Sequence, residues 1–355
     1  MLVSRSSRPR TSLDDVDVLS DMIAATRVGR PHSSLSCKHA PWGTRFEPFA
    51  GAGFHAVLRG SCWLVPLSGD AVRLGTGDVV FLPHGRGHVL ADSPATTPSR
   101  AEPITPQNPS SALPPSPDHE APDSEATILL CGGYLFDRSR PNPLLDQLPD
   151  AIHLPASAGD RRTLHAAVGL LRDELEQPLP GNAAVVPALL DAMLLYILRA
   201  WLTDAGQTAR HHHATAFSDP AVLSALTAIH QAPAQPWTVE SLADRAALSR
   251  AAFARRFTAC VGQPPMTYLT WWRMTLAARS LRATDAPVAA VAEQVGYASQ
   301  FAFANAFKRA IGVAPGRYRR DALQAPIDQA PIDTGSPGPA PRSDTHAAAH
   351  DGPCR

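Results

Sequence analysis

Residues 238–260, TVESLADRAALSRAAFARRFTAC, and residues 285–310, DAPVAAVAEQVGYASQFAFANAFKRA, determine how the rest of the chain is interpreted. In each stretch apolar residues recur with helical spacing, a short turn follows, and a serine then precedes a second helix with one apolar face. Ser249 and Ser299 are the expected caps of these second helices. The pattern predicts two helix-turn-helix units built to one design.

The second helix of each unit is the part that would enter DNA, and a helix from near Pro264 to near Arg282 should connect the units. The major groove admits a helix and presents a distinct donor and acceptor pattern for each base pair. An Arg suits guanine, Asn or Gln suits adenine, and Phe can pack on a thymine methyl group. The outward-facing residues are Ala251, Ala252, Arg255 and Arg256 in the first unit, and Gln300, Phe301, Ala304, Asn305 and Lys308 in the second.

The distribution of charge supports this placement. Residues 236–320 contain 12 Lys and Arg against 4 Asp and Glu, an excess of 8, although the whole chain has a formal net charge of zero. A basic module neutralises phosphates and gives salt-sensitive affinity for any duplex. A helical bundle with arginines on its solvated face is the alternative, but two copies of the unit favour DNA binding.

Residues 237–320 resemble the AraC/XylS family of bacterial transcription regulators. The resemblance is carried by the stretches SLADRAALSRAAFARRF, QPPMTYLTWWRM, APVAAVAEQVGY and FKRAIGVAPGRYRR. It implies two helix-turn-helix subdomains bridged by a long helix and set on successive major grooves of one face of double-stranded DNA. RNA polymerase is a further candidate partner.

Carried over position by position, the resemblance assigns the DNA contacts. Base contacts fall to Ala251, Arg255, Gln300, Phe301 and Asn305. Phosphate contacts fall to Ser249, Arg250, Arg256, Ser299, Lys308 and Arg309, with simple solvation as the alternative for any single cation. Ala251 and Phe301 stand where family members often carry larger or polar side chains, which leaves fewer direct hydrogen bonds to bases.

Length and composition indicate more than one domain. At 355 residues with 44% hydrophobic content, the chain can bury two cores. Residues 93–126 are rich in Pro without apolar periodicity, which predicts a disordered insertion, and 321–355 should be a disordered tail. The absence of a signal-like run, and of 18 uninterrupted apolar residues, predicts a cytoplasmic protein with no membrane contact.

The amino-terminal half reads as short strands. The runs HAVLRG, CWLVPL, AVRLG, DVVFLP and ATILLCGGYLF are broken by Gly or Pro, which predicts a small barrel. Residues 77–92, GDVVFLPHGRGHVLAD, resemble the second cupin motif, and residues 13–205 resemble the cupin-type ligand domain of a subset of AraC regulators. The expected fold is therefore α+β: a cupin-like β-barrel with a helical linker, then an all-α domain over 217–320.

The residues for a metal centre are few in this half. His55 stands alone where enzymatic cupins carry a second His and a Glu, and Val57 occupies the place of that second His. His88 fits the second motif, either stabilising a turn or contacting an effector. We expect no metal, no other cofactor and no enzyme activity.

A barrel mouth is a place for a small ligand, so effector binding is the leading hypothesis for this half. Thiol sensing is the alternative, because Cys37, Cys62 and Cys131 fall in or beside the barrel; Cys37 and Cys131 are the preferred candidates. The five cysteines show no CxxC spacing, so neither a disulfide framework nor a zinc site is expected, and buried thiols acting as small hydrophobes would look the same.

Two helices should connect the halves. Residues 161–176 and 182–202 show apolar faces wider than one neighbour can cover, so they pack on the barrel or on a second subunit. The resemblance implies a homodimer through this region. Together these features predict a sequence-specific DNA-binding regulator that responds to a small-molecule effector or a redox signal. A metal-dependent cupin enzyme and an effector-free architectural DNA binder are the alternatives.

Overall fold

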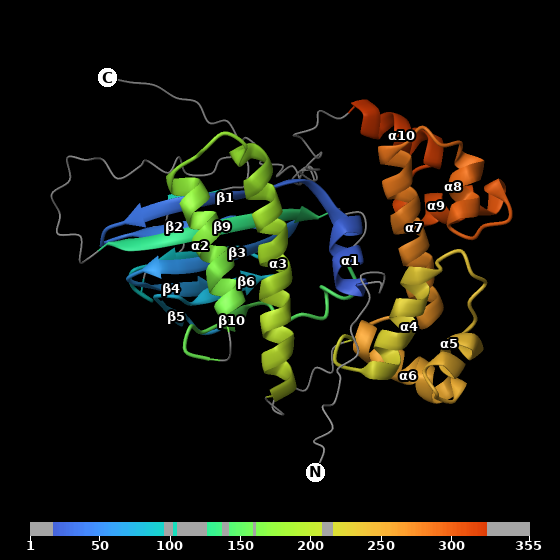
Figure 1. Ribbon diagram of the computed structural model, residues 1–355, viewed down its shortest axis with the longest axis horizontal. Helices are drawn as coiled ribbons and strands as arrows, with labels where there is room; N and C mark the ends of the chain where they lie inside the picture. Colours follow the sequence, from blue (N-terminus) through green and yellow to red (C-terminus); the bar gives the residue numbers. More distant parts are fainter. Residues whose placement is uncertain are drawn as a thin grey trace, which may run out of the picture.

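The computed structural model describes residues 17–95, 102–104, 126–136, 142–158, 161–207 and 216–324. A sheet-rich amino-terminal half and a helical carboxyl-terminal half lie side by side, with helix α1 (Val18–Thr26) between them (Figure 1). The predicted α+β class is confirmed.

The strands form two five-stranded sheets. The first has the order β1-β9-β3-β6-β10 and the second β5-β4-β7-β2-β8; among the described strands only β2 and β8 pair in parallel. The bounds are β1 Arg27–Lys38, β2 Gly43–Phe46, β3 Gly51–Arg59, β4 Ser61–Pro66, β5 Val72–Gly75, β6 Val79–Leu82, β7 His88–Ala91, β8 Glu102–Ile104, β9 Thr127–Phe136 and β10 Ile152–Leu154.

A small apolar core lies between the two sheets. Val57 and Leu129 of the first sheet pack with Leu64 and Leu90 of the second, so the sheets face each other. The prediction of a barrel needs correction here, because the described strands form two separate sheets, as in a jelly roll, without closing into one.

The sequence runs identified five of these strands, namely β3, β4, β5, β6 and β9. Strand β1 was not predicted, because the positions of β1 that face inward carry Ser34, Ser36 and Lys38 in place of apolar residues. The predicted disordered insertion, 93–126, is wrong for residues 102–104, which form β8 beside β2. Most of that insertion lies outside the described residues.

Helices α2 (Arg162–Glu176) and α3 (Asn182–Gln207) lie against the first sheet, as the helical linker prediction required (Figure 1). The hydroxyl of Tyr134 on β9 donates a hydrogen bond to the Leu190 carbonyl oxygen at 2.6 Å, which ties α3 to the sheet. Over Asn182–Asp204 helix α3 is long and apolar enough to cross a membrane by length and composition. This is weak support for a membrane span, since helices packed on a protein core pass the same test.

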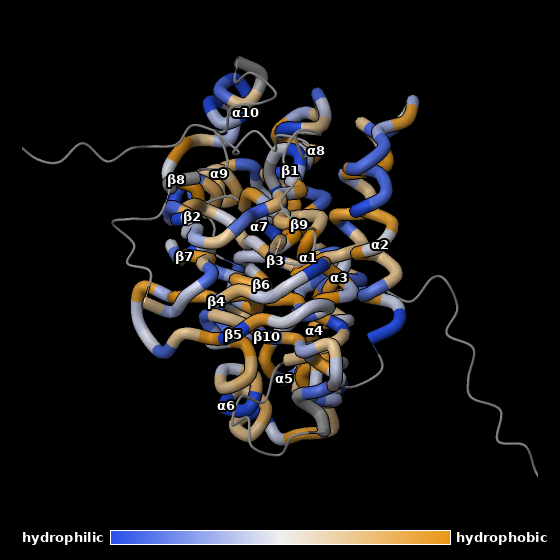
Figure 2. The backbone as a smooth tube through the Cα atoms, turned by 90° about the vertical axis from the view of Figure 1, so that its left-hand side faces the viewer, coloured by the Kyte–Doolittle hydropathy of each residue, from blue (hydrophilic) through white to orange (hydrophobic). Residues whose placement is uncertain are grey.

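The carboxyl-terminal half is helical. Its elements are α4 Pro220–Gln231, α5 Val239–Arg245, α6 Arg250–Val261, α7 Pro265–Ala283, α8 Val288–Gln294, α9 Gln300–Ile311 and α10 Pro315–Gln324. The long helix α7 connects the two units as predicted, whereas α4 was not predicted. Helix α10, mostly hydrophilic in Figure 2, continues to Gln324, so the predicted tail from 321 begins four residues too early.

The two helix-turn-helix units differ in their cores. The core of α8 and α9 is separate: Val291, Phe303 and Phe307 pack with Met274 and Leu281 of α7. Phe253 and Phe257 of α6 instead belong to one continuous core that passes through α1 into the first sheet. The hydrophobic core of the first unit is therefore continuous with that of the amino-terminal half, whereas the core of the second unit is separate.

Candidate nucleic-acid interface

The second helix of each unit begins where the sequence places it. The Ser249 hydroxyl accepts a hydrogen bond from the Ala252 N–H, and the Ser299 hydroxyl accepts one from the Ala302 N–H, each at 3.4 Å. Each cap satisfies a backbone donor that the first turn of a helix leaves unpaired. Helices α6 and α9 are thus matched in length and start, and each ends at a glycine in the left-handed conformation.

The candidate base-reading side chains all face solvent. Phe303 and Phe307 on α9 are fully buried, and so are Phe253 and Phe257 on α6, so the apolar stripe of each helix turns inward. The residues left outside include all five predicted base contacts: Ala251, Arg255, Gln300, Phe301 and Asn305. Their contacts with bases stay predictions.

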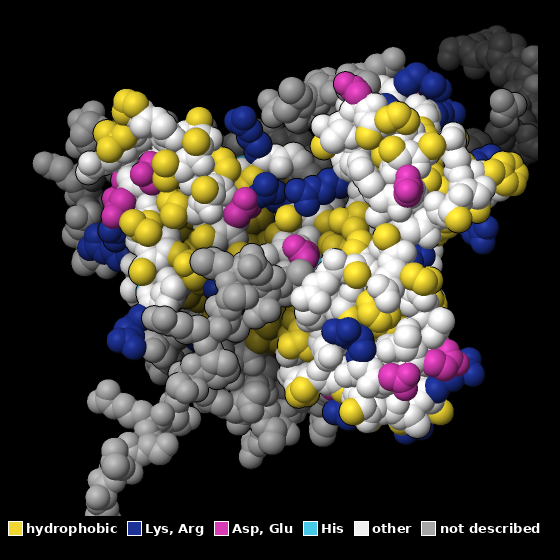
Figure 3. Space-filling model, turned by 45° about the vertical axis from the view of Figure 1, so that its right-hand side comes forward, with side chains coloured by type: hydrophobic (Ala, Val, Ile, Leu, Met, Phe, Trp, Pro, Cys, Tyr) yellow, Lys and Arg dark blue, Asp and Glu magenta, His cyan; other side chains and the backbone are white. Residues whose placement is uncertain are grey.

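Two of the cations assigned to phosphate already have acidic partners. The Arg250 Nε atom lies 2.8 Å from Glu240 Oε1, with both side chains well exposed. Arg256 donates through Nε to Asp219, which comes just before α4. These partners were missed because neither acidic residue is close to its arginine in sequence. Figure 3 shows basic side chains on both lobes of this half, with acidic ones also on both.

Asp219 holds α4 and α6 together. Its Oδ1 atom caps α4 by accepting from the N–H groups of Ala221 and Val222 at 3.0 and 3.2 Å. Burial would raise the pKa of Asp219, but the hydrogen bond from Arg256 and the two backbone donors lower it below its ordinary value. Arg256 therefore has a structural role in the first unit, alongside the predicted phosphate contact.

In the second unit the cations on the reading helix are Lys308 and Arg309, in the last turn of α9 and both exposed. Its first two turns carry Gln300, Phe301 and Asn305 and no charge. The uncharged first two turns of α9 suit contacts with bases, and its basic last turn suits contacts with phosphates.

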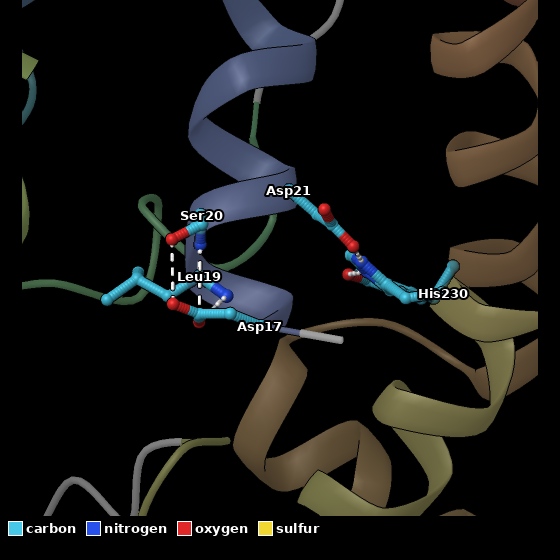
Figure 4. Close-up of polar contacts among 6 residues, drawn as sticks. Asp17, Leu19, Ser20, Asp21 and His230 are labelled. Carbon is cyan, nitrogen blue, oxygen red and sulfur yellow. Dashed lines mark hydrogen bonds and ion pairs between the residues drawn. The ribbon is translucent and has the colours of Figure 1, made fainter. Parts of the chain in front are cut away.

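A polar chain links the first unit to α1. His230, near the end of α4, lies with Nδ1 3.4 Å from Asp21 Oδ2 and Nε2 2.9 Å from the Tyr268 hydroxyl, and its ring stacks on Trp272 at 3.9 Å. Figure 4 shows Asp21 pointing from α1 toward His230. An ionised Asp21 can only accept, so Nδ1 donates and Nε2 accepts from Tyr268. Burial lowers the pKa of His230, and the Asp21 carboxylate opposes that shift in part.

Comparisons with known proteins match this arrangement. A family model described as a cupin matches residues 17–203, and one described as a helix-turn-helix domain matches residues 242–321. AraC-like transcription regulators of Streptomyces lividans and Streptomyces antibioticus are each 35% identical to the chain, over 86% of it and 98% and 99% of their own lengths. The solved DNA-binding domain of the global transcriptional factor AdpA, in complex with a target DNA, is 36% identical over 29% of this chain and 93% of that one, with a TM-score of 0.28.

The chain belongs to the AraC-type transcription regulators. The predicted resemblance is confirmed, and so is the function of a DNA-binding transcription regulator. The cupin match covers the sheet-rich half and the helices α2 and α3.

Between the two sheets of this regulator, the buried His55 and His88 form a chain with the half-buried Cys131. His88 Nδ1 lies 3.2 Å from the Arg86 carbonyl oxygen, the two Nε2 atoms are 2.7 Å apart, and His55 Nδ1 lies 2.9 Å from Cys131 Sγ. A carbonyl only accepts, so His88 Nδ1 donates, His55 Nε2 donates to His88, and the Cys131 thiol donates to His55. Both histidines are therefore neutral in this chain of hydrogen bonds.

Burial controls the titration of these groups. It lowers the pKa of His88 to about 4 and that of His55 well below its ordinary value, the latter with a contribution from His88. Burial also raises the pKa of Cys131 to about 12, so its reactive thiolate form is disfavoured. Because His55 uses opposite ring nitrogens toward His88 and Cys131, the three groups do not converge, and the described residues hold no group of three His, Cys, Asp or Glu side chains suited to a metal ion.

A small cavity adjoins this chain. It has a volume of about 20 Å³ and is lined by Ser34, Ser36, Lys38, Thr44, Phe46, Leu90, Leu129 and Cys131. That is room for about one water molecule, far below the several hundred Å³ of a typical ligand pocket. Phe46 stacks on His88 with ring centres 4.7 Å apart and covers one side. A larger ligand would have to displace it.

The two preferred cysteines do not come together. In the pairing of β1 with β9, Ser34 lies opposite Cys131 and Cys37 opposite Ile128. Since side chains alternate between the faces of a strand and Ser34, Ser36 and Lys38 line the cavity, Cys37 points to the other face. Cys62 packs in the same small core as Cys131.

Proposed function

We propose that this regulator lays α6 and α9 in successive major grooves on one face of double-stranded DNA. The observation that carries this is the pair of serine-capped helices with exposed outer faces, joined through the single helix α7. Base contacts are made by Ala251, Arg255, Gln300, Phe301 and Asn305, and phosphate contacts by Ser249, Arg250, Arg256, Ser299, Lys308 and Arg309.

The matched variants Arg255→Ala and Lys308→Ala test this assignment on the full chain. Arg255→Ala should weaken binding to a selected duplex by about 1 to 3 kcal/mol and relax one base preference, as loss of a bidentate Arg to guanine contact requires. Lys308→Ala should weaken binding to every duplex and reduce the salt slope. Equal losses for Arg255→Ala on selected and random duplexes would contradict its role in reading a base.

The signal reaches the DNA-binding units through α1. Helix α1 belongs to the half that carries the cavity, yet it packs on α4 and α7 and bonds His230 through Asp21. A signal that shifts α1 changes how the first unit sits relative to the second, and a ligand does so only through different affinities for the two arrangements.

The signal we favour is a small molecule at the cavity. Thr44 is buried, and its hydroxyl has no hydrogen-bond partner among the described residues, so the cavity offers an unused polar group beside Lys38. A redox signal through Cys131 is the second candidate: its thiol already donates to His55, although its raised pKa slows oxidation. Cys131→Ser should abolish a response to oxidant while leaving a response to a metabolite, and reporter output separates the two.

Further assignments belong to the same proposal. Exposed apolar residues on the α2–α3 hairpin, Leu170, Leu179 and Val185, support a homodimer through this surface. RNA polymerase is a candidate partner for the open groove between α7 and α8, which includes Leu276, Arg279 and Gln294. The regulator works in the cytoplasm, without a metal or other cofactor and without an enzyme activity of its own.

A further inference from the structure

Phe301 is the most exposed large apolar side chain of the described residues, at 77% of its full area. It stands in the first turn of α9, two residues after the capping Ser299. Its helix mates Phe303 and Phe307 are fully buried, so the second unit completes its core without it. A phenyl ring held in water on a helix that faces DNA has a large apolar area to bury on binding.

Equivalent positions on the two reading helices carry different chemistry. Two residues after the cap stands Ala251 on α6 and Phe301 on α9, and six residues after the cap stands Arg255 or Asn305. Positions four residues apart lie on one face of a helix, one turn from each other. Helix α6 therefore presents a small side chain and a guanidinium, whereas α9 presents a phenyl ring and an amide.

We propose that the two units read different base pairs: α6 a guanine through Arg255, and α9 an A·T segment in which Phe301 packs on a thymine C5 methyl group. This rests on the proposed function. Asn305 completes the second unit by pairing with the N6 and N7 atoms of an adenine, and Gln300 can do the same. The first two turns of α9 carry no cation to bond guanine, and Lys308 and Arg309 behind them hold the phosphates.

Removal of the methyl group alone tests the contact. The full chain is first used to select its preferred duplexes from a random library. In a selected duplex each thymine is then replaced in turn by deoxyuridine, which lacks only the C5 methyl group, and dissociation constants are measured by fluorescence anisotropy. We expect one or two thymines at which the wild type loses about fourfold in affinity, the factor that corresponds to about 0.8 kcal/mol for one buried methyl-sized group.

Three variants make the result specific to Phe301. Phe301→Ala, which should fold because the side chain is exposed, is expected to bind the thymine duplex more weakly and to be insensitive to deoxyuridine at those positions, as a double-mutant cycle requires for a direct contact. Phe301→Leu should keep a partial response. Arg255→Ala should bind more weakly and keep the full response, because it acts through the other helix.

The outcomes separate the two levels of the argument. If no thymine matters to the wild type, or if deoxyuridine weakens Phe301→Ala by the same factor, the methyl contact is refuted while DNA binding stands. If Phe301→Ala lowers transcription without changing any dissociation constant, Phe301 faces a protein partner and the inference is refuted. If the full chain prefers no duplex over a heparin-competed background, the proposed function itself fails.

Discussion

The two helix-turn-helix units share a design and differ in how they are attached. The first unit packs its Phe253 and Phe257 into a core that continues through α1 to the first sheet, whereas the second encloses Phe303 and Phe307 in a core of its own. In the first unit Arg250 and Arg256 are held by Glu240 and Asp219. The repeated sequence thus produces one unit whose core is continuous with the amino-terminal half, and one with a separate core that is attached through α7 and through the contact of its turn with the segment before α5.

The largest expected effect comes from emptying the two cores in turn. Phe257→Ala and Phe307→Ala each remove a fully buried phenyl ring and should cost about 3 to 5 kcal/mol. Because only the first core is continuous with α1, Phe257→Ala should lower amide hydrogen-exchange protection in α1 and the first sheet as well as in α4–α6. Phe307→Ala should affect α8–α10 and the part of α7 that packs on them, but not α1.

Hydrogen exchange measured by mass spectrometry on both variants decides whether the cores are separate. Loss of protection in α1 after Phe307→Ala would show that the cores communicate through α7. Unchanged protection in α1 after Phe257→Ala would show that the shared core carries little energy.

Acid should unfold the two units at different pH values. Folding lowers the pKa of the buried His88 to about 4, so the unfolded chain binds this proton more tightly. Stability from this group is complete above about pH 6.5 and falls by about 3 kcal/mol as the pH drops to 4. His55, whose pKa is also lowered, adds to the loss.

The first unit should therefore lose protection along with the sheets as the pH falls, while α8 and α9 keep theirs. Circular dichroism and hydrogen exchange between pH 7 and pH 4 test this. The control is His88→Phe, an apolar replacement beside Phe46, which should flatten the profile. A profile unchanged by His88→Phe would assign the acid sensitivity to other groups.

Asp21→Asn tests the polar link between α1 and the first unit. We expect a loss of about 1 kcal/mol, because the partner of His230 loses its charge while Asp21 itself is partly exposed. The pKa of His230, already lowered by burial, should fall further without the opposing carboxylate, so the variant should lose more stability than the wild type as the pH falls and the unfolded histidine takes up a proton. A titration of His230 by NMR in both proteins measures the shift, and an unchanged pKa would contradict the contact.

Local pattern predicted the units, the linker helices and five strands, because each is encoded by periodicity and caps within its own residues. The caps Ser249 and Ser299 lie at the predicted positions. Strand β1 was not predicted because its inward residues are polar. The contact of Asp21 with His230 was not predicted because the two residues are 209 positions apart in the sequence. The pairing of Arg256 with Asp219 likewise depends on how α4 packs on α6.

The turn inside each unit supplies the smallest effect. After the first helix the chain takes a positive φ at Ala247 in the first unit, φ 52°, and at Gly296 in the second, φ 83°. A residue with a Cβ atom is strained by about 1 to 2 kcal/mol in this conformation. A glycine removes the strain, but it also gives the unfolded chain more conformational freedom, which offsets part of the gain in stability. Ala247→Gly should therefore stabilise the regulator by about 0.5 to 1 kcal/mol, measured as the shift of its urea midpoint at constant slope.

The reverse change in the second unit is the matched control for Ala247→Gly. A Cβ atom on Gly296 would lie 2.6 Å from the Ala234 carbonyl oxygen and close to the Arg273 guanidinium, so Gly296→Ala must destabilise. Arg273 also donates to the Pro233 carbonyl oxygen at 2.7 Å, so this turn touches the segment that precedes α5 in the first unit. If Ala247→Gly destabilised while Gly296→Ala did not, the turns would not be equivalent, and the repeat would be confined to the helices. If the signs are as expected, the two turns share one backbone geometry, and only the second has become a contact between the units.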